Sequence, residues 1–194
     1  MKRIFLIMTC LVTLLLSACG RKDDYDEIYR QAVMEDEGDG TLFSLIYLDD
    51  DDIPELVVYN GYREHYSVYT VRDGQLFCMV DSMTTVEMVY FERSGIIASF
   101  ARWNGGGDEG GYGWCYYQTN KGSTLTEDAV PVLDYSYNAV YDEEGIYTGG
   151  GITAYYYMGQ ETDQASYEEK MNALGITEGG GKICLENAFG KEEL

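Results

Sequence analysis

The densest group of side chains able to do chemistry is a run of carboxylates within residues 47–56, YLDDDDIPEL. Asp49 and Asp51 are two residues apart, and Glu55 follows four residues later. Calcium is a hard cation that takes six to eight oxygen ligands, so alternate carboxylates with a backbone carbonyl suit it. Adjacent carboxylates also repel one another, so we expect a cation near the run. The alternative is a solvated acidic turn that Pro54 holds in shape without a metal.

This run resembles the aspartate-rich calcium loops written D-x-D-G-D-G-x-x-E, which also occur in small exported bacterial lipoproteins as a turn between two strands. The resemblance implies side-chain ligands from Asp49 and Asp51, the backbone carbonyl of Ile53, and Glu55 bound directly or through water. The chain departs from the pattern at the first acidic position, at both glycines and at the bidentate EF-hand glutamate, which are here Tyr47, Asp50, Asp52 and Val58. Missing ligands and a missing turn glycine should weaken the site toward millimolar affinity.

A second candidate is the glycine-rich segment at residues 104–113, NGGGDEGGYG. It contains G-x-G-x-x-G, but its two acidic side chains would repel a pyrophosphate, and an aromatic strand follows it in place of a helix. We therefore expect no nucleotide partner. Aromatic side chains beside carboxylates and amides can bind sugars, so Trp103, Tyr112 and Trp114 form a candidate binding surface. The alternative is a flexible hairpin connection between core strands.

The first eighteen residues have the layout of a secretory signal, with Lys2 and Arg3 followed by an apolar run at residues 4–16. That run is shorter than the roughly 20 residues of a membrane-spanning helix. The residues LSAC at 16–19 resemble the lipobox of bacterial lipoproteins. The resemblance implies cleavage before Cys19, a diacylglyceryl group on its sulfur and acylation of the new amino terminus. The membrane is then a partner of the mature chain through this lipid. An ordinary secretory signal is the alternative.

The charge balance excludes one class of partner. The chain has 34 acidic and 13 basic residues and a formal net charge of −21. Nucleic-acid binders bring cations to the phosphate backbone, so we expect no nucleic-acid partner. A hydrophobic content of 45% argues against a disordered chain. With 23 glycines, 19 tyrosines and only 2 prolines, the composition suits a turn-rich β protein.

The remaining cysteines and the one histidine give little sign of catalysis. Cys78, Cys115 and Cys184 each have apolar or aromatic neighbours, which favours buried, reduced thiols over a disulfide. Their spacing does not suit zinc. His65 follows a glutamate in a polar stretch without a nucleophile motif, so we interpret it as a surface histidine.

Hydrophobic periodicity predicts a mainly β fold, an antiparallel sheet or sandwich with one short helix near each end of the mature chain, α+β at the margin. Apolar side chains with helical spacing predict a first helix over residues 25–33, which the glycines at 38 and 40 end. A capping box at Ser166 predicts a second helix over 166–174. Alternating patterns bounded by turn residues predict strands at 42–48, 56–59, 66–71, 76–80, 86–92, 96–103, 112–119, 124–133, 137–141, 146–148, 152–157 and 183–185.

We therefore divide the chain into three parts. These are a lipoprotein signal peptide at 1–18, the lipidated cysteine with a tether and first helix at 19–40, and one antiparallel β-rich domain at 41–194. The leading hypothesis is a non-catalytic, lipid-anchored extracytoplasmic binding domain of the cell envelope. It would bind calcium weakly and a glycan or protein ligand. The alternatives are a carboxylate-based hydrolase of envelope or environmental polymers, and an acidic inhibitor or immunity-type protein for a basic partner.

Overall fold

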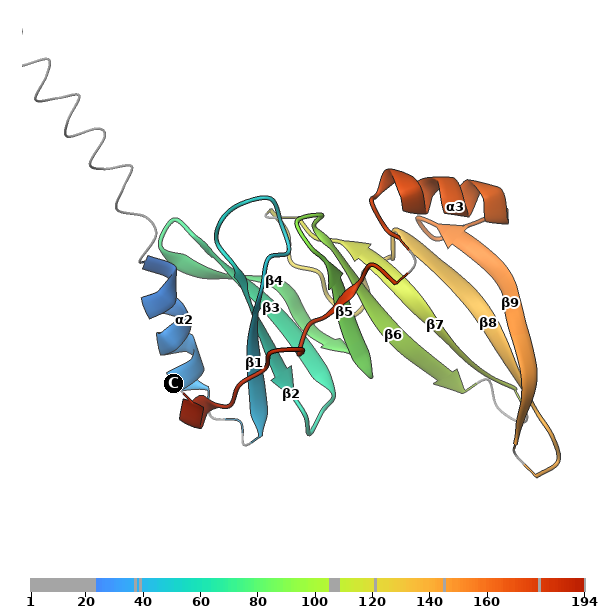
Figure 1. Cartoon of the computed structure of the whole chain (residues 1–194), viewed down its shortest axis with the longest axis horizontal. Helices are drawn as coiled ribbons and strands as arrows, with labels where there is room; N and C mark the ends of the chain where they lie inside the picture. The colour runs from blue at the N-terminus through green and yellow to red at the C-terminus, as the bar shows by residue number, and fades with distance from the viewer. Residues whose placement is uncertain are drawn as a thin grey trace, which may run out of the picture.

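The computed structural model describes residues 24–36, 38, 40–104, 109–120, 122–144, 146–177 and 179–193, with the backbone but not the side chains at 24, 101–104, 109–112 and 147. Two antiparallel sheets lie beside each other in an elongated molecule, and one α-helix packs near each end (Figure 1). The predicted fold class, mainly β with antiparallel strands and two short helices, is confirmed. Within the described residues, no helix combines the length and the apolar character needed to cross a membrane.

The first sheet is a four-stranded meander. Its strands, in spatial and chain order, are β1 (Thr41–Ile46), β2 (Glu55–Asn60), β3 (His65–Arg72) and β4 (Gln75–Thr84). Side chains alternate between buried and half-buried positions along most of β3, because successive residues of a strand point to opposite faces. A two-residue turn of Asp73 and Gly74, with φ of 48° and 74°, joins β3 to β4, which is the geometry that Asp-Gly favours.

The second sheet has seven strands in the order β10-β9-β8-β7-β6-β5-β11. Their bounds are β5 (Glu87–Phe91), β6 (Ile96–Asn104), β7 (Glu109–Gln118), β8 (Leu133–Tyr141), β9 (Tyr147–Tyr157), β10 (Gln160–Thr162) and β11 (Lys182–Ile183). The short β11 returns from the C-terminal segment to pair with β5, and the short β10 pairs with β9. The chain itself therefore covers part of each outer edge, three residues of β9 and two of β5.

Two predicted strand boundaries were wrong. Residues 124–132 are not a ladder strand, and β8 begins only at Leu133. Pro131 lacks the N–H that a ladder needs, and the segment before it makes a single bridge from Leu125 to Val80. The predicted strands at 146–148 and 152–157 form one strand, β9, because the intervening glycines continue the pairing with β8.

Helix α2 (Asp24–Glu35) packs its apolar side on the first sheet. Tyr29 and Val33 are buried with Phe43 of β1, as the helical spacing predicted. The C-terminal segment runs back past both sheets to this helix and ends in the short 3₁₀ helix η1 (Lys191–Glu193) (Figure 1). There Lys191 Nζ donates to the carbonyl oxygens of Met34 at 2.6 Å and Asp36 at 2.8 Å. A cation thus satisfies carbonyl groups that the helix end leaves free.

Helix α3 (Gln164–Ala173) covers one face of the second sheet. Its N-cap is Asp163 and not Ser166, so the predicted capping box was wrong. Asp163 accepts hydrogen bonds from the Ser166 N–H at 2.9 Å and from the Ser166 hydroxyl at 2.7 Å. Aspartate is as good an N-cap as serine, and it accepts from the residue three positions on. Tyr167 and Met171 then face the sheet.

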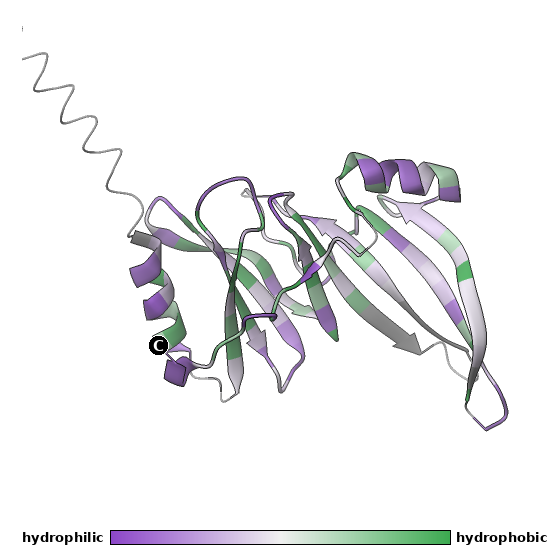
Figure 2. Cartoon of the chain, in the orientation of Figure 1, coloured by the Kyte–Doolittle hydropathy of each residue, from purple (hydrophilic) through white to green (hydrophobic). Residues whose placement is uncertain are grey.

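The two sheets share a hydrophobic core. Val68 and Met79 of the first sheet pack with Met88 and Ile97 of the second, and Cys184 of the C-terminal segment completes the cluster. Hydrophobic residues are denser on the first sheet and β5 than on β8 and β9 (Figure 2). Strand β8 alternates tyrosine with polar residues along part of its length, and β9 consists largely of tyrosine, glycine and threonine. The described cysteines are free thiols, as predicted, but only Cys184 is buried, whereas Cys78 and Cys115 are half-buried. Burial raises the pKa of Cys78 and of Cys115 to about 11 each.

Candidate cation site and aromatic groove

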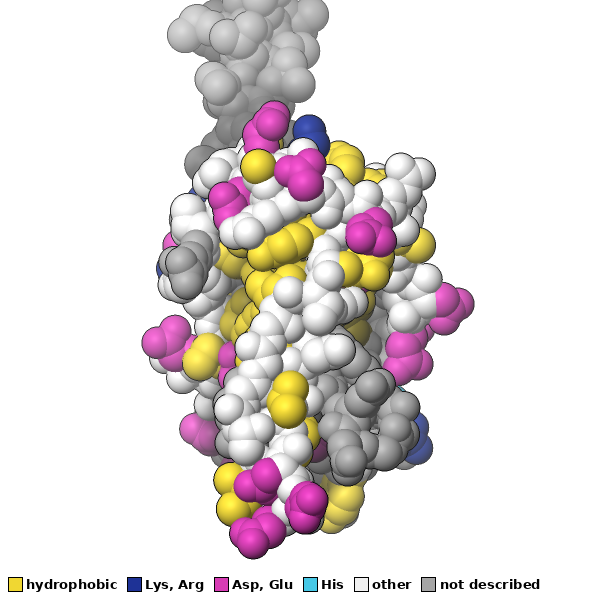
Figure 3. Space-filling model, turned by 90° about the vertical axis from the view of Figure 1, so that its right-hand side faces the viewer, with side chains coloured by type: hydrophobic (Ala, Val, Ile, Leu, Met, Phe, Trp, Pro, Cys, Tyr) yellow, Lys and Arg dark blue, Asp and Glu magenta, His cyan; other side chains and the backbone are white. Residues whose placement is uncertain are grey.

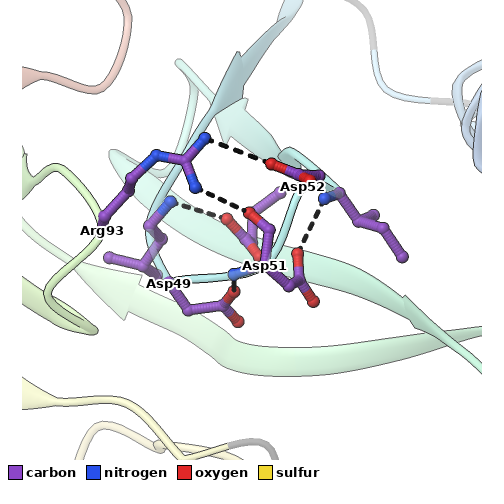
Figure 4. Close-up of polar contacts among 7 residues, drawn as sticks. Asp49, Asp51, Asp52 and Arg93 are labelled. Atoms are coloured by element: carbon purple, nitrogen blue, oxygen red, sulfur yellow. Dashed lines mark hydrogen bonds and ion pairs between the residues drawn. The ribbon is translucent and has the colours of Figure 1, made fainter.

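The connection between β1 and β2, residues 47–54, is folded by its own aspartates. Asp49 Oδ1 accepts from the Asp51 N–H at 3.0 Å, and Asp51 Oδ1 accepts from the Ile53 N–H at 2.7 Å (Figure 4). These are Asx turns, in which an aspartate side chain bonds to its own backbone two residues on. The turn therefore forms without the glycines of the calcium-loop pattern, and it draws both carboxylates toward its inside.

Glu55 is the first residue of β2, and its side chain is fully buried, with 0% exposure. Its Oε2 accepts from the Leu48 N–H at 2.7 Å, whereas its buried Oε1 finds no hydrogen-bond partner among the described residues. Burial raises the pKa of Glu55 to about 8, the Leu48 hydrogen bond opposes the rise, and the charges of Asp49 and Asp51 add to it. A buried carboxylate oxygen without a donor is costly, so this group requires a proton or a cation.

The three acidic side chains converge. Single carboxylate oxygens of Asp49, Asp51 and Glu55 all lie within 4.8 Å of one another. Two oxygens bound to one calcium ion, each about 2.3–2.6 Å from it, are at most about 5 Å apart. The structure thus brings together three of the four predicted ligands at a compatible spacing. Ile53 enters the turn through its N–H, which donates to Asp51 Oδ1.

Arg93, in the turn between β5 and β6, supplies part of the positive charge that the acidic run requires. The sequence pattern did not identify this residue. Arg93 Nη2 lies 3.5 Å from Asp52 Oδ1, and Nη1 donates to the Asp51 carbonyl at 3.2 Å (Figure 4). The guanidinium also lies 5.3 Å from the centre of the Tyr47 ring. The Asp52 side chain is 92% exposed, so this ion pair belongs to the outer rim of the turn. The cluster of Asp49, Asp51 and Glu55 faces inward.

Backbone contacts fix the acidic turn at a junction of three elements. The Arg93 N–H donates to the Tyr47 carbonyl at 2.9 Å, and the Gly95 N–H donates to the Leu48 carbonyl at 2.7 Å. From α2, the Tyr29 hydroxyl donates to the Pro54 carbonyl at 2.7 Å. A cation bound in the turn would therefore stabilise the contact between the helix and both sheets.

A second concave feature is a groove of about 880 Å³ between α3 and the second sheet. Five rings line its sheet side: Phe91, Trp114, Tyr116, Tyr135 and Tyr155. Carboxylate and amide side chains line it as well: Glu87, Gln164, Glu168 and Asn172. Among the described residues that line it, none is Lys, Arg or His. Viewed from the α3 and β9 end, hydrophobic side chains gather in a hollow bordered by polar ones (Figure 3).

The predicted binding surface is placed only in part. Trp114 lies in the groove, and its ring centre is 5.2 Å from that of Phe100. Trp103 and Tyr112 belong to β6 and β7, but their side chains lie outside the described residues. Sequence reasoning missed Tyr135 and Tyr155 as groove residues. For Tyr135 the available signal was its alternation with smaller residues along β8, which indicates a face but not its neighbours. Tyr155 begins a run of three tyrosines, which indicates no face.

Comparison with known proteins identifies no family for this chain. No family model matches the chain, and no curated protein or solved structure is significantly similar to it. The acidic turn and the groove are therefore the features of the chain that bear on its function.

Proposed function

We propose that the protein is a lipid-anchored extracytoplasmic binding domain whose acidic turn binds calcium as a structural cation. The observation that carries the calcium assignment is the buried Glu55 Oε1, which has no hydrogen-bond partner among the described residues and belongs to the cluster with Asp49 and Asp51. An acidic cluster on the surface needs no ion. A fully buried carboxylate in the cluster needs a cation beside it, unless the carboxylate is protonated.

The donor chemistry favours calcium over other metals. The cluster offers only carboxylate oxygens, which suit hard cations, and its described members include no thiolate or imidazole. Calcium tolerates an irregular shell completed by backbone carbonyls and water, whereas magnesium demands near-ideal octahedral geometry and gives up its waters reluctantly. A hairpin turn with three carboxylates suits the irregular coordination of calcium better than the octahedral coordination of magnesium. With three protein carboxylates, the expected affinity is weak.

The location rests on the lipobox at residues 16–19. Helix α2 begins five residues after Cys19, so an acyl group on that cysteine would hold the helix within about 18 Å of the anchor point. Metabolic labelling with a radioactive fatty acid tests this location. Label should enter the wild-type chain and be absent from Cys19→Ser. Equal labelling of the two chains would overturn the lipid anchor.

Thermal unfolding tests the cation site. Because every described element lies within 24–193, a chain of residues 20–194 retains them all. We expect calcium in the millimolar range to raise its unfolding midpoint over that in chelator, with magnesium much less effective, since a ligand of the native state stabilises it by mass action. Glu55→Gln, which keeps an acceptor for the Leu48 N–H, should abolish the increase.

Asp50→Asn is the matched control. Asp50 is an exposed carboxylate of the same turn and is not part of the cluster. The control should keep the calcium response while removing the same charge as Glu55→Gln. If wild type shows no calcium response, or if both variants lose it equally, the effect is not coordination at Glu55 and the site is only a turn.

A further inference from the structure

Aromatic side chains form a row across the middle of the second sheet, on the face that α3 covers in part. Glu87 of β5 is opposite Phe100 of β6, and Phe100 is opposite Trp114 of β7. Residues opposite each other in an antiparallel pair share a face, so these side chains lie side by side. The Phe100 and Trp114 rings are 5.2 Å apart between centres.

The row continues through the next two strands. Cys115 of β7 is opposite Asp134 of β8, so the same register places Trp114 opposite Tyr135. Tyr135 is in turn opposite Tyr155 of β9. Neighbouring strands are about 4.8 Å apart, so the row from β5 to β9 extends over roughly 19 Å. It is an aromatic platform that ends in a carboxylate at Glu87.

Polar side chains border this platform along α3. Gln164, Glu168 and Asn172 all line the groove, and their spacing of four residues places them on one side of the helix. All three are exposed, and Gln164 Nε2 donates to Glu168 Oε1 at 2.8 Å. The groove therefore has an aromatic floor and a border that both donates and accepts hydrogen bonds.

We infer that this groove binds a linear, uncharged oligosaccharide; the inference rests on the proposed binding function and names its ligand class. Sugar rings present apolar C–H faces to aromatic rings and equatorial hydroxyls to carboxylates and amides at their edges, which matches the floor and border of the groove. An anionic polysaccharide is disfavoured, because Glu87 and Glu168 line the groove and the chain carries a net charge of −21.

The arrangement of the sheet disfavours a peptide. A peptide that adds a strand binds along a sheet edge, whereas the aromatic platform lies on a face of the sheet; at the edges, β11 pairs with two residues of β5 and β10 with three residues of β9. A basic peptide would be attracted by charge alone, and such binding collapses as salt screens it. Binding of an uncharged sugar through stacking and hydrogen bonds should change little with salt.

Tryptophan fluorescence and calorimetry test the inference on residues 20–194. The chain has two tryptophans, so Trp103→Phe leaves Trp114 as the reporter. The probes are cellohexaose and chitohexaose as neutral glycans, hexagalacturonate as an anionic glycan, and hexalysine as a basic peptide. We expect saturable changes in emission with a neutral glycan, unaltered between low and high salt, and no response to hexagalacturonate.

Variants on the two sides of the groove localise the binding. Tyr135→Ala and, independently, Asn172→Ala should each weaken glycan binding by about tenfold in calorimetry, which is the range of a contact residue. Asn172 is exposed on α3, so its variant keeps the test valid if the sheet variant fails to fold. Tyr62→Ala, at a tyrosine that is 85% exposed outside the groove, should bind as wild type does.

Several outcomes would overturn the inference. No response to either neutral glycan at millimolar concentration excludes the ligand class, and salt-sensitive binding of hexalysine in its place indicates a basic partner. Release of reducing ends would show turnover rather than binding. The calcium response in thermal unfolding needs no glycan, so the two proposals can fail separately. A chain that binds no sugar but is still stabilised by calcium would refute this inference and leave the proposed cation site intact.

Discussion

Leu48 and Glu55 close the acidic turn from the inside. The Leu48 N–H donates to Glu55 Oε2 at 2.7 Å, and both residues have 0% exposure. This bond fixes the Glu55 carboxylate beneath the turn and leaves Oε1 pointing to no donor among the described residues. Strand pairing between Ile46 and Glu55 makes the placement a property of the hairpin itself.

The first prediction concerns pH. Burial raises the pKa of Glu55 from 4.5 to about 8, so in chelator the native state holds a proton that the unfolded chain has lost at intermediate pH. With respect to this group, the free energy of unfolding should therefore be highest below pH 4.5 and should fall by about 4 kcal/mol as pH rises from 4.5 to 8. Urea unfolding at several pH values in chelator measures the slope.

Glu55→Gln is the reference for that slope. It cannot titrate, so its free energy of unfolding should lack the decrease between pH 4.5 and 8, and saturating calcium should flatten the wild-type curve by replacing the proton. Equal slopes for wild type and Glu55→Gln in chelator would show that Glu55 does not carry the pH dependence.

Arg93→Ala should change stability and calcium affinity in opposite directions. It removes an exposed ion pair, a hydrogen bond to the Asp51 carbonyl and a contact with the Tyr47 ring, so the free energy of unfolding should fall by about 1 kcal/mol. It also removes a positive charge near the carboxylate cluster, so calcium should bind several-fold more tightly. Isothermal titration and urea unfolding measure the two effects. Weaker calcium binding would mean that Arg93 holds the turn in its binding shape.

The sequence was sufficient for the parts of the fold and site that depend on neighbours in the chain. The apolar alternation of β3 and the helical spacing of α2 are local, and both elements lie where they were predicted. Asp49, Asp51 and Glu55 fall within seven residues, so one turn can bring them together. Arg93 is 42 residues from Asp51 along the chain, and no pattern in the sequence indicates that the β5–β6 turn lies on the acidic turn.

The lining of the groove could be predicted from the sequence even less well than the acidic turn. Trp114 was identified by its residue type, but its neighbours Tyr135 and Tyr155 depend on pairing across three strands, and Asn172 depends on how α3 packs on the sheet. Strand registers and helix packing are set by long-range burial, which single-sequence periodicity does not specify.

Lys191→Ala should loosen the end of α2. The ammonium donates to the carbonyl oxygens of Met34 and Asp36, which have no further turn of helix to accept from. Losing these bonds should lower the free energy of unfolding by about 1 kcal/mol. Hydrogen exchange should speed up locally in the last turn of α2. Lys170→Ala, a cation on α3, is the control and should leave exchange in α2 unchanged; a uniform increase across both sheets would contradict a local cap.

Adjacent glycines in β9 should respond oppositely to alanine. A Cβ at Gly150 would overlap the Asn138 carbonyl oxygen and come within 2.8 Å of the Tyr137 hydroxyl, so Gly150→Ala must move backbone in β8. We expect it to lower the free energy of unfolding by about 2 kcal/mol, the usual range for overpacking. A Cβ at Gly151 meets nothing within 4 Å, and its backbone is not in the left-handed region. Gly151→Ala should therefore be neutral or stabilising by about 0.5 kcal/mol, because alanine restricts the unfolded chain. Urea unfolding of the two variants decides this, and equal destabilisation of both would mean that the register of β8 and β9 differs from the one described.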